Sequence, residues 1–146
     1  MQNVGQTIKL FISQKGSSLR LKQTDIQVDN KGVLGDKFYN KNRERSVLLT
    51  SIESYDLVNR HNIILPYGAL GENILMDFNP YALEVGSWLS IGSAILEISQ
   101  PCTICNHLSV FDKRLPKLLQ NDRGIFAKVI HSGTITEGDA VRLNTI

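Results

Sequence analysis

The fold class is decided by the stretch SWLSIGSAILEI, residues 87–98. Two apolar-rich runs, 87–91 and 94–98, flank the pair Gly92-Ser93. Short apolar runs that are bounded by turn residues indicate β-strands. A two-residue link that begins with glycine suits a type II′ turn, because the first central residue of that turn needs a positive φ. The stretch therefore predicts a β-hairpin.

Further short strands are predicted on both sides of this hairpin. They are expected at residues 7–13, 19–22, 26–28, 46–49, 71–76 and 125–130. A second Gly-X pair, Gly138-Asp139, lies between residues 134–137 and 140–143 and predicts a second hairpin. Residues 32–45 are polar and predict a long exposed loop. Many short strands with frequent turn signals are typical of a mainly β barrel or sandwich.

Two short helices complete the prediction. Thr50, followed three residues later by Glu53, matches a capping box, so a helix is expected from this point to about Arg60. A second helix is expected over residues 111–120, with Pro116 in its first turn, where proline is tolerated.

Composition narrows the class of protein. A chain of 146 residues with 42% hydrophobic residues predicts one globular domain over residues 1–146. The formal charge of +2 and the scattered basic residues argue against nucleic-acid binding. We predict no signal peptide and no membrane helix, because the first residues lack a signal-peptide pattern and no apolar run approaches the length of ~20 residues that a membrane helix needs. We therefore expect a cytoplasmic protein with no membrane partner.

The loop after the hairpin contains both cysteines, Cys102 and Cys105. Their spacing is compatible with half of a zinc site, a redox dithiol, a single nucleophilic or metal-binding cysteine, or two cysteines that only pack. The polar neighbours Thr103, Asn106 and His107 favour an accessible loop, and His107 could favour the thiolate form of a cysteine.

Other residues could contact an anion. The helix start at Thr50 and Ser51 offers backbone N–H groups that favour phosphate, although capping its own helix is the commoner role of such a pair. Loop arginines can clamp an anion or stay solvated. Acids and amides beside glycines usually bind backbone groups of their own turn. These further candidates are Arg43, Arg45, Arg123, Asp36, Glu72 and Asn73.

A set of segments also occurs in a specific order. They are GVLGD (32–36), VLLT (47–50), GENI (71–74), VGS (85–87), IG (91–92), ISQP (98–101) with Cys105, RGIFAKV (123–129) and GDAVRL (138–143). In this order they resemble the MOSC domain, the C-terminal domain of molybdenum cofactor sulfurases. That domain also occurs in amidoxime-reducing molybdoenzymes and in stand-alone bacterial proteins.

The resemblance implies a MOSC-like β-barrel with two or three short helices and a molybdopterin-type molybdenum cofactor. It implies one key cysteine, which matches Cys105. That cysteine is either a molybdenum ligand or the carrier of a persulfide sulfur. The cofactor-binding residues expected on this basis are Thr50, Ser51, Glu72, Asn73, Arg45 and Arg123.

Three departures from the family pattern matter. Residues 102–105 replace the common Arg-x-Pro-Cys and add a second thiol at Cys102. Phe38 stands where many relatives have the histidine of Gly-Asp-x-His. The chain also has no room for a pyridoxal-phosphate desulfurase domain, so a separate sulfur-donor or electron-donor protein is expected.

Two classes of function follow. In the first, the protein binds the cofactor and either reduces N-hydroxylated compounds or passes sulfur from Cys105 to the metal centre. In the sulfur version, Cys102 attacks the Cys105 persulfide, and a disulfide forms as reduced sulfur is released. In the second class, the protein is a non-enzymatic binding or adaptor domain with structural or zinc-binding cysteines, or a degenerate family member that binds a partner only. Exposed strand edges also suggest a homodimer.

Overall fold

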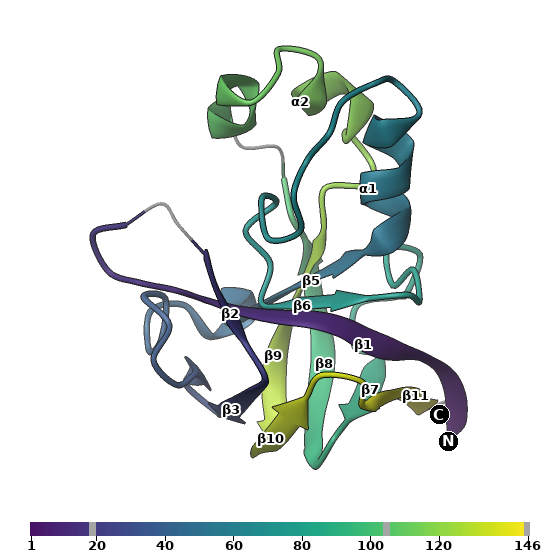
Figure 1. The fold of residues 1–146 in the computed structure, drawn as a ribbon. Helices are drawn as coiled ribbons and strands as arrows, with labels where there is room; N and C mark the ends of the chain where they lie inside the picture. Colours follow the sequence, from purple (N-terminus) through teal and green to yellow (C-terminus); the bar gives the residue numbers. More distant parts are fainter. Residues whose placement is uncertain (18–19, 104–105, 145–146) are drawn as a thin grey trace.

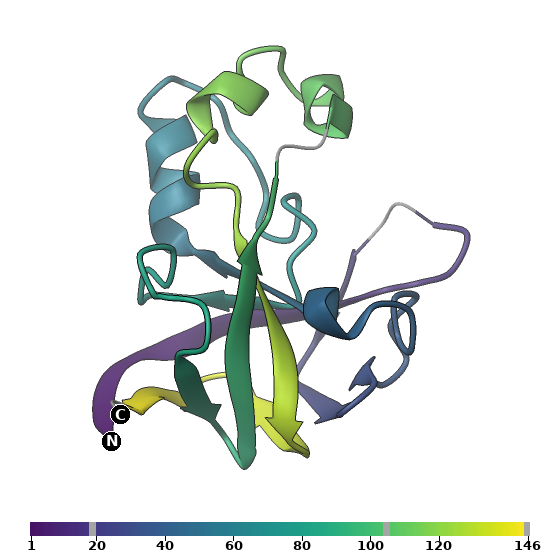
Figure 2. The same cartoon turned by 180° about the vertical axis from the view of Figure 1, so that it is seen from behind.

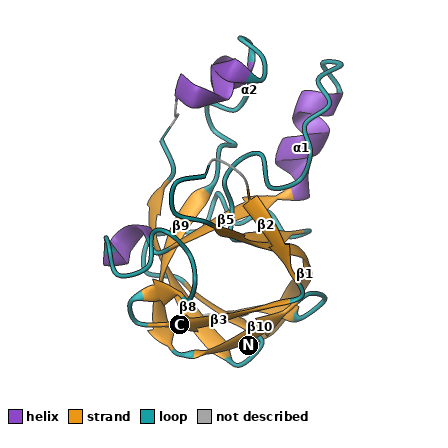
Figure 3. Ribbon diagram, turned by 60° about the vertical axis from the view of Figure 1, so that its left-hand side comes forward, coloured by secondary structure: helices purple, strands orange, loops and turns teal. Residues whose placement is uncertain are grey.

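The computed structural model describes residues 1–17, 20–103 and 106–144. In this part of the chain, seven strands close into a barrel in the order β11-β7-β8-β9-β5-β6-β1, because β1 also pairs with β11. The pair β5–β6 is parallel, and the other neighbours are antiparallel. Figure 3 shows the ring of strands. The barrel strands are β1 (Gln2–Ser13), β5 (Val47–Ser51), β6 (Ile74–Met76), β7 (Trp88–Ile91), β8 (Ala94–Pro101), β9 (Ile125–His131) and β11 (Ala140–Asn144).

The remaining elements extend the barrel at its two ends. Strand β2 (Arg20–Gln23) pairs with the last residues of β1. A separate three-stranded sheet has the order β10-β3-β4, formed by β10 (Gly133–Thr136), β3 (Asp25–Asp29) and β4 (Gly32–Val33). The helices α1 (Ile52–Asn59) and α2 (Leu115–Leu118) lie together at the opposite end of the barrel from β10 (Figure 1). Two 3-10 helices are η1 (Arg43–Arg45) and η2 (Asn106–Val110).

Two apolar clusters form the core. The first fills the barrel with alternate strand residues, such as Ala94, Leu96 and Ile98 of β8, which are buried while their neighbours are not. The second lies under the helices, where Tyr55 and Val58 of α1 pack with Leu115 of α2. The view from behind shows the same division, with the helices at one end and the termini side by side at the other (Figure 2). None of the helices in the described segments is long and apolar enough to cross a membrane.

The predicted hairpin at residues 87–98 is confirmed. Strands β7 and β8 pair antiparallel, with Ile91 opposite Ala94. Gly92 has a φ of 59°, and Ser93 is not among the residues with a positive φ. This combination is that of a type II′ turn, as the glycine in the first central position predicts.

The predicted second hairpin is wrong. Strand β10 pairs with β3, whereas β11 pairs with β1 and β7. The turn lies one residue earlier than predicted, because the Asp139 N–H bonds the Thr136 carbonyl at 2.9 Å. Gly138, with a φ of 93°, is then the second central residue, as in a type II turn. Such a turn splays the strands that it joins, so β10 and β11 enter different sheets.

The helices also differ from the prediction. The N-cap of α1 is Ser51, whose Oγ accepts a hydrogen bond from the Glu53 N–H at 3.1 Å, whereas Thr50 is the penultimate residue of β5. The expected second helix is limited to α2, with Pro116 in its first turn as predicted. The expected loop at 32–45 contains the short elements β4 and η1.

Candidate functional site

A cavity of about 390 Å³ lies beside the end of the barrel that carries the helices. Its wall is assembled from β1, β2, η1, β5 and β9, the loops before η1 and β6, and the segment after β8. Some of these pieces follow one another in the sequence, such as η1 and β5, but β1, β5, β9 and the segment after β8 are far apart in it. The barrel closure brings them together.

The charges in the wall are strongly unequal. Of the residues that the structure describes, four cationic side chains line the cavity, Arg20, Lys41, Arg45 and Arg123, against one carboxylate, Asp36. The carboxylate is already used within the protein, because Asp36 Oδ1 accepts the Ser13 N–H at 2.7 Å and Oδ2 accepts the Phe38 N–H at 3.0 Å. The remaining charge of the wall is positive and suits an anionic ligand.

Arg123 is the most deeply buried of these cations. Only 4% of its surface is exposed. One guanidinium nitrogen, Nη1, donates to the Leu70 carbonyl, but the buried Nε has no hydrogen-bond partner in the part of the chain that the structure describes. Among the described residues, Arg123 forms no ion pair with a carboxylate. A buried cation without an opposite charge beside it is costly in free energy. An anion in the cavity would supply that opposite charge.

Arg20 reaches the same wall from β2. Its Nη1 donates to the Ser13 hydroxyl, and a Cβ on Gly71 would lie 2.7 Å from Nη2. Gly71 has a φ of 86°, so glycine serves both the turn and this close approach. Burial lowers the pKa of Arg20, the nearby charges of Asp36 and Glu72 raise it, and Arg123 lowers it further. An arginine nevertheless stays protonated at neutral pH.

Arg45 belongs to η1, and its guanidinium carbon lies 4.7 Å from the centroid of the Phe126 ring. This distance is within the range of a cation–π contact, which holds the side chain against the cavity wall. Arg45 and Arg123 are thus predicted site residues that the structure brings together. Arg20 and Lys41 were missed, because no local pattern distinguishes them from other basic residues. Arg43 is also predicted, but it does not line the cavity.

Asn73 lines the cavity, but its amide is occupied by the protein. Oδ1 accepts the Leu48 N–H at 3.0 Å, and Nδ2 donates to the Phe11 carbonyl at 3.2 Å and to Asp36 Oδ1 at 3.1 Å. The side chain therefore joins β1, β5 and the Asp36 loop. Direct contact between Asn73 and a cofactor stays a prediction.

Three other predicted residues, Thr50, Ser51 and Glu72, are fully buried and do not line the cavity. The Thr50 hydroxyl donates to Glu72 Oε2 at 2.8 Å, and the Ser51 hydroxyl caps α1. These side chains form the layer behind the cavity wall. The structure does not bring them to the cavity itself.

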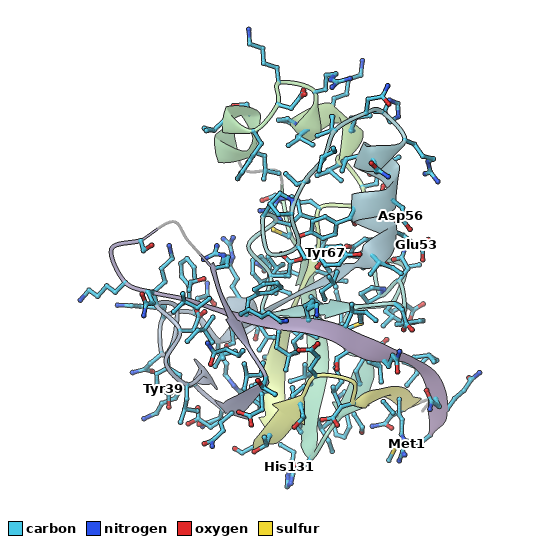
Figure 4. All side chains as sticks on the ribbon, in the orientation of Figure 1. Met1, Tyr39, Glu53, Asp56, Tyr67 and His131 are labelled. Atoms are coloured by element: carbon cyan, nitrogen blue, oxygen red, sulfur yellow. The ribbon has the colours of Figure 1, made fainter. Side chains whose placement is uncertain are left out.

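Cys102 lines the cavity beside Thr103. Its backbone N–H donates to the Gly124 carbonyl at 3.0 Å, which places the cysteine loop next to the segment that carries Arg123. The predicted key residue Cys105 lies outside the described residues. Within the described segments, no three His, Cys, Asp or Glu residues are grouped closely enough to hold a metal ion. Figure 4 shows His131 at the opposite end of the barrel from Tyr67 and Asp56.

The fold and the candidate site together define a small β-barrel protein with a cavity lined mainly by cationic side chains. A family model, the MOSC domain, matches residues 24–142, and the chain belongs to this family. The comparison with curated proteins gives no match.

Solved structures share the fold at low sequence identity. The YuaD protein from Bacillus subtilis superposes with a TM-score of 0.85 at 17% identity, covering 97% of this chain and 96% of that one. YiiM from Geobacillus stearothermophilus gives a TM-score of 0.72 at 17% identity, covering 99% and 75%. YiiM from Escherichia coli gives 0.73 at 18% identity, covering 97% and 70%. At these identities the likeness concerns the fold alone.

Proposed function

We propose that this chain binds a molybdopterin-type molybdenum cofactor in the cationic cavity. The observation that carries the proposal is Arg123, a buried arginine in the cavity wall whose Nε has no hydrogen-bond partner within residues 1–17, 20–103 and 106–144. The MOSC family, to which the chain belongs, is associated with molybdenum cofactor binding.

The residues of the cavity fit such a group. Its volume of about 390 Å³ lies within the range of about 300–1,000 Å³ that is usual for small-molecule sites. Arg123 and Arg20 would hold the phosphate of the cofactor, since guanidinium groups match phosphate oxygens in geometry and charge. Arg45 would add positive charge, and Leu48 and Phe126 provide apolar wall against which a ring system can pack.

The cysteine loop would supply the reactive sulfur. Cys102 lines the cavity, and Cys105 follows it three residues later. A thiolate at Cys105 is the kind of soft ligand that molybdenum accepts. When bound, the cofactor would supply a redox-active metal centre that either acts on N-hydroxylated compounds or receives sulfur. The first role needs an electron-donor protein and the second a sulfur-donor protein.

In the sulfur version of the proposal, Cys105 carries a persulfide. The Cys102 thiolate attacks Cys105 Sγ, a Cys102–Cys105 disulfide forms, the persulfide bond breaks, and hydrosulfide leaves with the electron pair. An external thiol then reduces the disulfide to restore both cysteines. The expected signature is a Cys102→Ser variant that keeps its persulfide after the wild type has released sulfide.

The test is the molybdenum and pterin content of the protein, purified from a host that makes the cofactor. We expect both in the wild type, loss of molybdenum in Cys105→Ala, and loss of both in Arg123→Gln. Arg142→Gln, which alters an exposed arginine of β11, is the matched control and should keep both. A folded wild type with neither molybdenum nor pterin would contradict the proposal. About one zinc ion per chain, lost in the Cys102/Cys105 double variant, would favour the adaptor-type alternative.

A further inference from the structure

Behind the cavity wall lies a buried polar network. Glu72 is fully buried, and its Oε2 accepts hydrogen bonds from the Thr50 hydroxyl at 2.8 Å and from the Tyr55 hydroxyl at 2.5 Å. Its other oxygen, Oε1, is buried without a partner among the described residues. Neither Glu72 nor Tyr55 lines the cavity.

The Tyr55 hydroxyl also acts as an acceptor. It accepts the N–H of Gly68 at 3.1 Å and the N–H of Leu70 at 3.3 Å. One oxygen atom on α1 thus holds the loop that precedes β6. The ring is itself fixed by an edge contact with Tyr67, at a centroid distance of 4.9 Å.

This loop in turn holds the buried arginine of the site. The Leu70 carbonyl accepts the hydrogen bond from Arg123 Nη1, and Leu70 itself lines the cavity. A continuous path therefore runs from Glu72 through the Tyr55 hydroxyl and Leu70 to the Arg123 guanidinium. No other hydrogen bond of the Arg123 side chain is present in the described part of the chain.

We propose that Tyr55 is a positioning residue, whose hydroxyl fixes Leu70 and thereby orients the Arg123 guanidinium toward an anionic ligand that Tyr55 never touches. This inference rests on the anion site of the proposed function.

The chemistry of Tyr55 suits this role. Burial first, then the Glu72 charge and the hydrogen bond to it, raise the pKa of Tyr55 far above its ordinary value of 10.0. The hydroxyl therefore stays protonated at every working pH, donates to Glu72, and keeps its lone pairs for the two loop N–H groups.

The experiment measures the affinity of the protein for inorganic phosphate by calorimetry. Tyr55→Phe keeps the ring and removes the hydroxyl, and we expect about tenfold weaker binding, comparable to a lost charged hydrogen bond. Thr50→Val is the matched control, because it removes the other donor to Glu72 but leaves the two hydrogen bonds from Gly68 and Leu70 to the Tyr55 hydroxyl in place. Its phosphate affinity should stay within about twofold of the wild type.

A double-mutant cycle separates positioning from general loosening. In the Arg123→Gln background, Tyr55→Phe should cause no further weakening, because the group that it positions is absent. Equal weakening in both backgrounds, or unchanged binding by Tyr55→Phe, would overturn the inference. A wild type that does not bind phosphate would instead overturn the anion site itself, and the inference with it.

If Tyr55→Phe does not fold, amide hydrogen exchange of the wild type gives the answer. Phosphate should slow exchange at Gly68 and Leu70, because the loop is held between Tyr55 and the ligand-bound arginine. Exchange at both amides that is unchanged by saturating phosphate would refute the coupling.

Discussion

The barrel interior and the cavity wall share strands of the barrel, but they differ in the kind of side chain that they bury. The barrel cluster consists of apolar side chains, among them Leu89, Leu96 and Ile98, each with no exposed surface. The charged residues buried in the described part of the chain are Asp36, Glu72 and Arg123, and all three lie at or behind the cavity. Apolar burial stabilises a fold, whereas buried charge destabilises it unless it is matched. The difference indicates that the barrel interior supplies stability, whereas the cavity wall contains buried charge that lowers it.

The largest expected effect is in the barrel. Leu96→Ala removes a fully buried side chain from β8 and should lower the free energy of unfolding by about 2–5 kcal/mol, because a cavity is left in a closed barrel. Urea denaturation measures this change. The phosphate affinity of the folded fraction should be unaltered. A loss of affinity equal to the loss of stability would show that the two regions are not separable.

An intermediate effect is expected in the cavity wall. Arg123→Met removes the buried guanidinium and keeps much of the side-chain volume. The free energy of unfolding should change by less than about 1 kcal/mol, since the lost hydrogen bond is offset by the lost cost of burying a charge. Phosphate binding should weaken by about 10- to 100-fold, in line with the loss of a charge-assisted contact. Arg142→Met is the control for both measurements. A strongly destabilised variant that still binds phosphate would show that Arg123 stabilises the fold and does not bind the anion.

The smallest effect concerns an exposed ion pair near α2, remote from both regions. Arg114 bonds Asp112 at 2.9 Å and holds the pKa of this carboxyl at about 2, below its ordinary 3.8. Because the folded-state pKa is depressed, the pair contributes stability above about pH 4, and this contribution is lost as pH falls through about 2. Thermal melting at pH 6 and at pH 2 should therefore differ slightly less for Asp112→Asn than for the wild type. Salt should reduce even this difference, because the pair is exposed. An identical pH response in both proteins would show that the ion pair makes no measurable contribution to stability.

Part of the fold was predictable because some signals are local. The glycine of the 87–98 hairpin specifies the turn by itself, and Pro116 confines the start of α2. The same reasoning misplaced the turn at Gly138, because a glycine suits both the first central position of a type II′ turn and the second of a type II turn. The choice between them depends on the distant partners of β10 and β11, which local sequence does not contain.

Some residues of the candidate site were likewise predictable from the sequence, whereas others were not. Arg45 and Arg123 were predicted to contact an anion, and both line the cavity. Arg20 completes the wall only because β2 pairs with the end of β1, and Tyr55 is linked to the site only through a loop that folds back on α1. Conversely, Thr50 and Glu72 were expected at the ligand, yet they bond each other behind the wall. A sequence pattern marks a polar residue but not which neighbour satisfies it.

By itself the sequence determined the strand-rich class, the first hairpin and, through the ordered segments over residues 32–143, the family to which the chain belongs. Only the tertiary structure decided which cations share a cavity and which polar groups stand behind it. The physical reason is the distance along the chain over which each interaction acts. Turn chemistry and strand periodicity act over a few residues, whereas the pairing of Arg123 with Leu70 spans 53 positions and exists only when the barrel is closed.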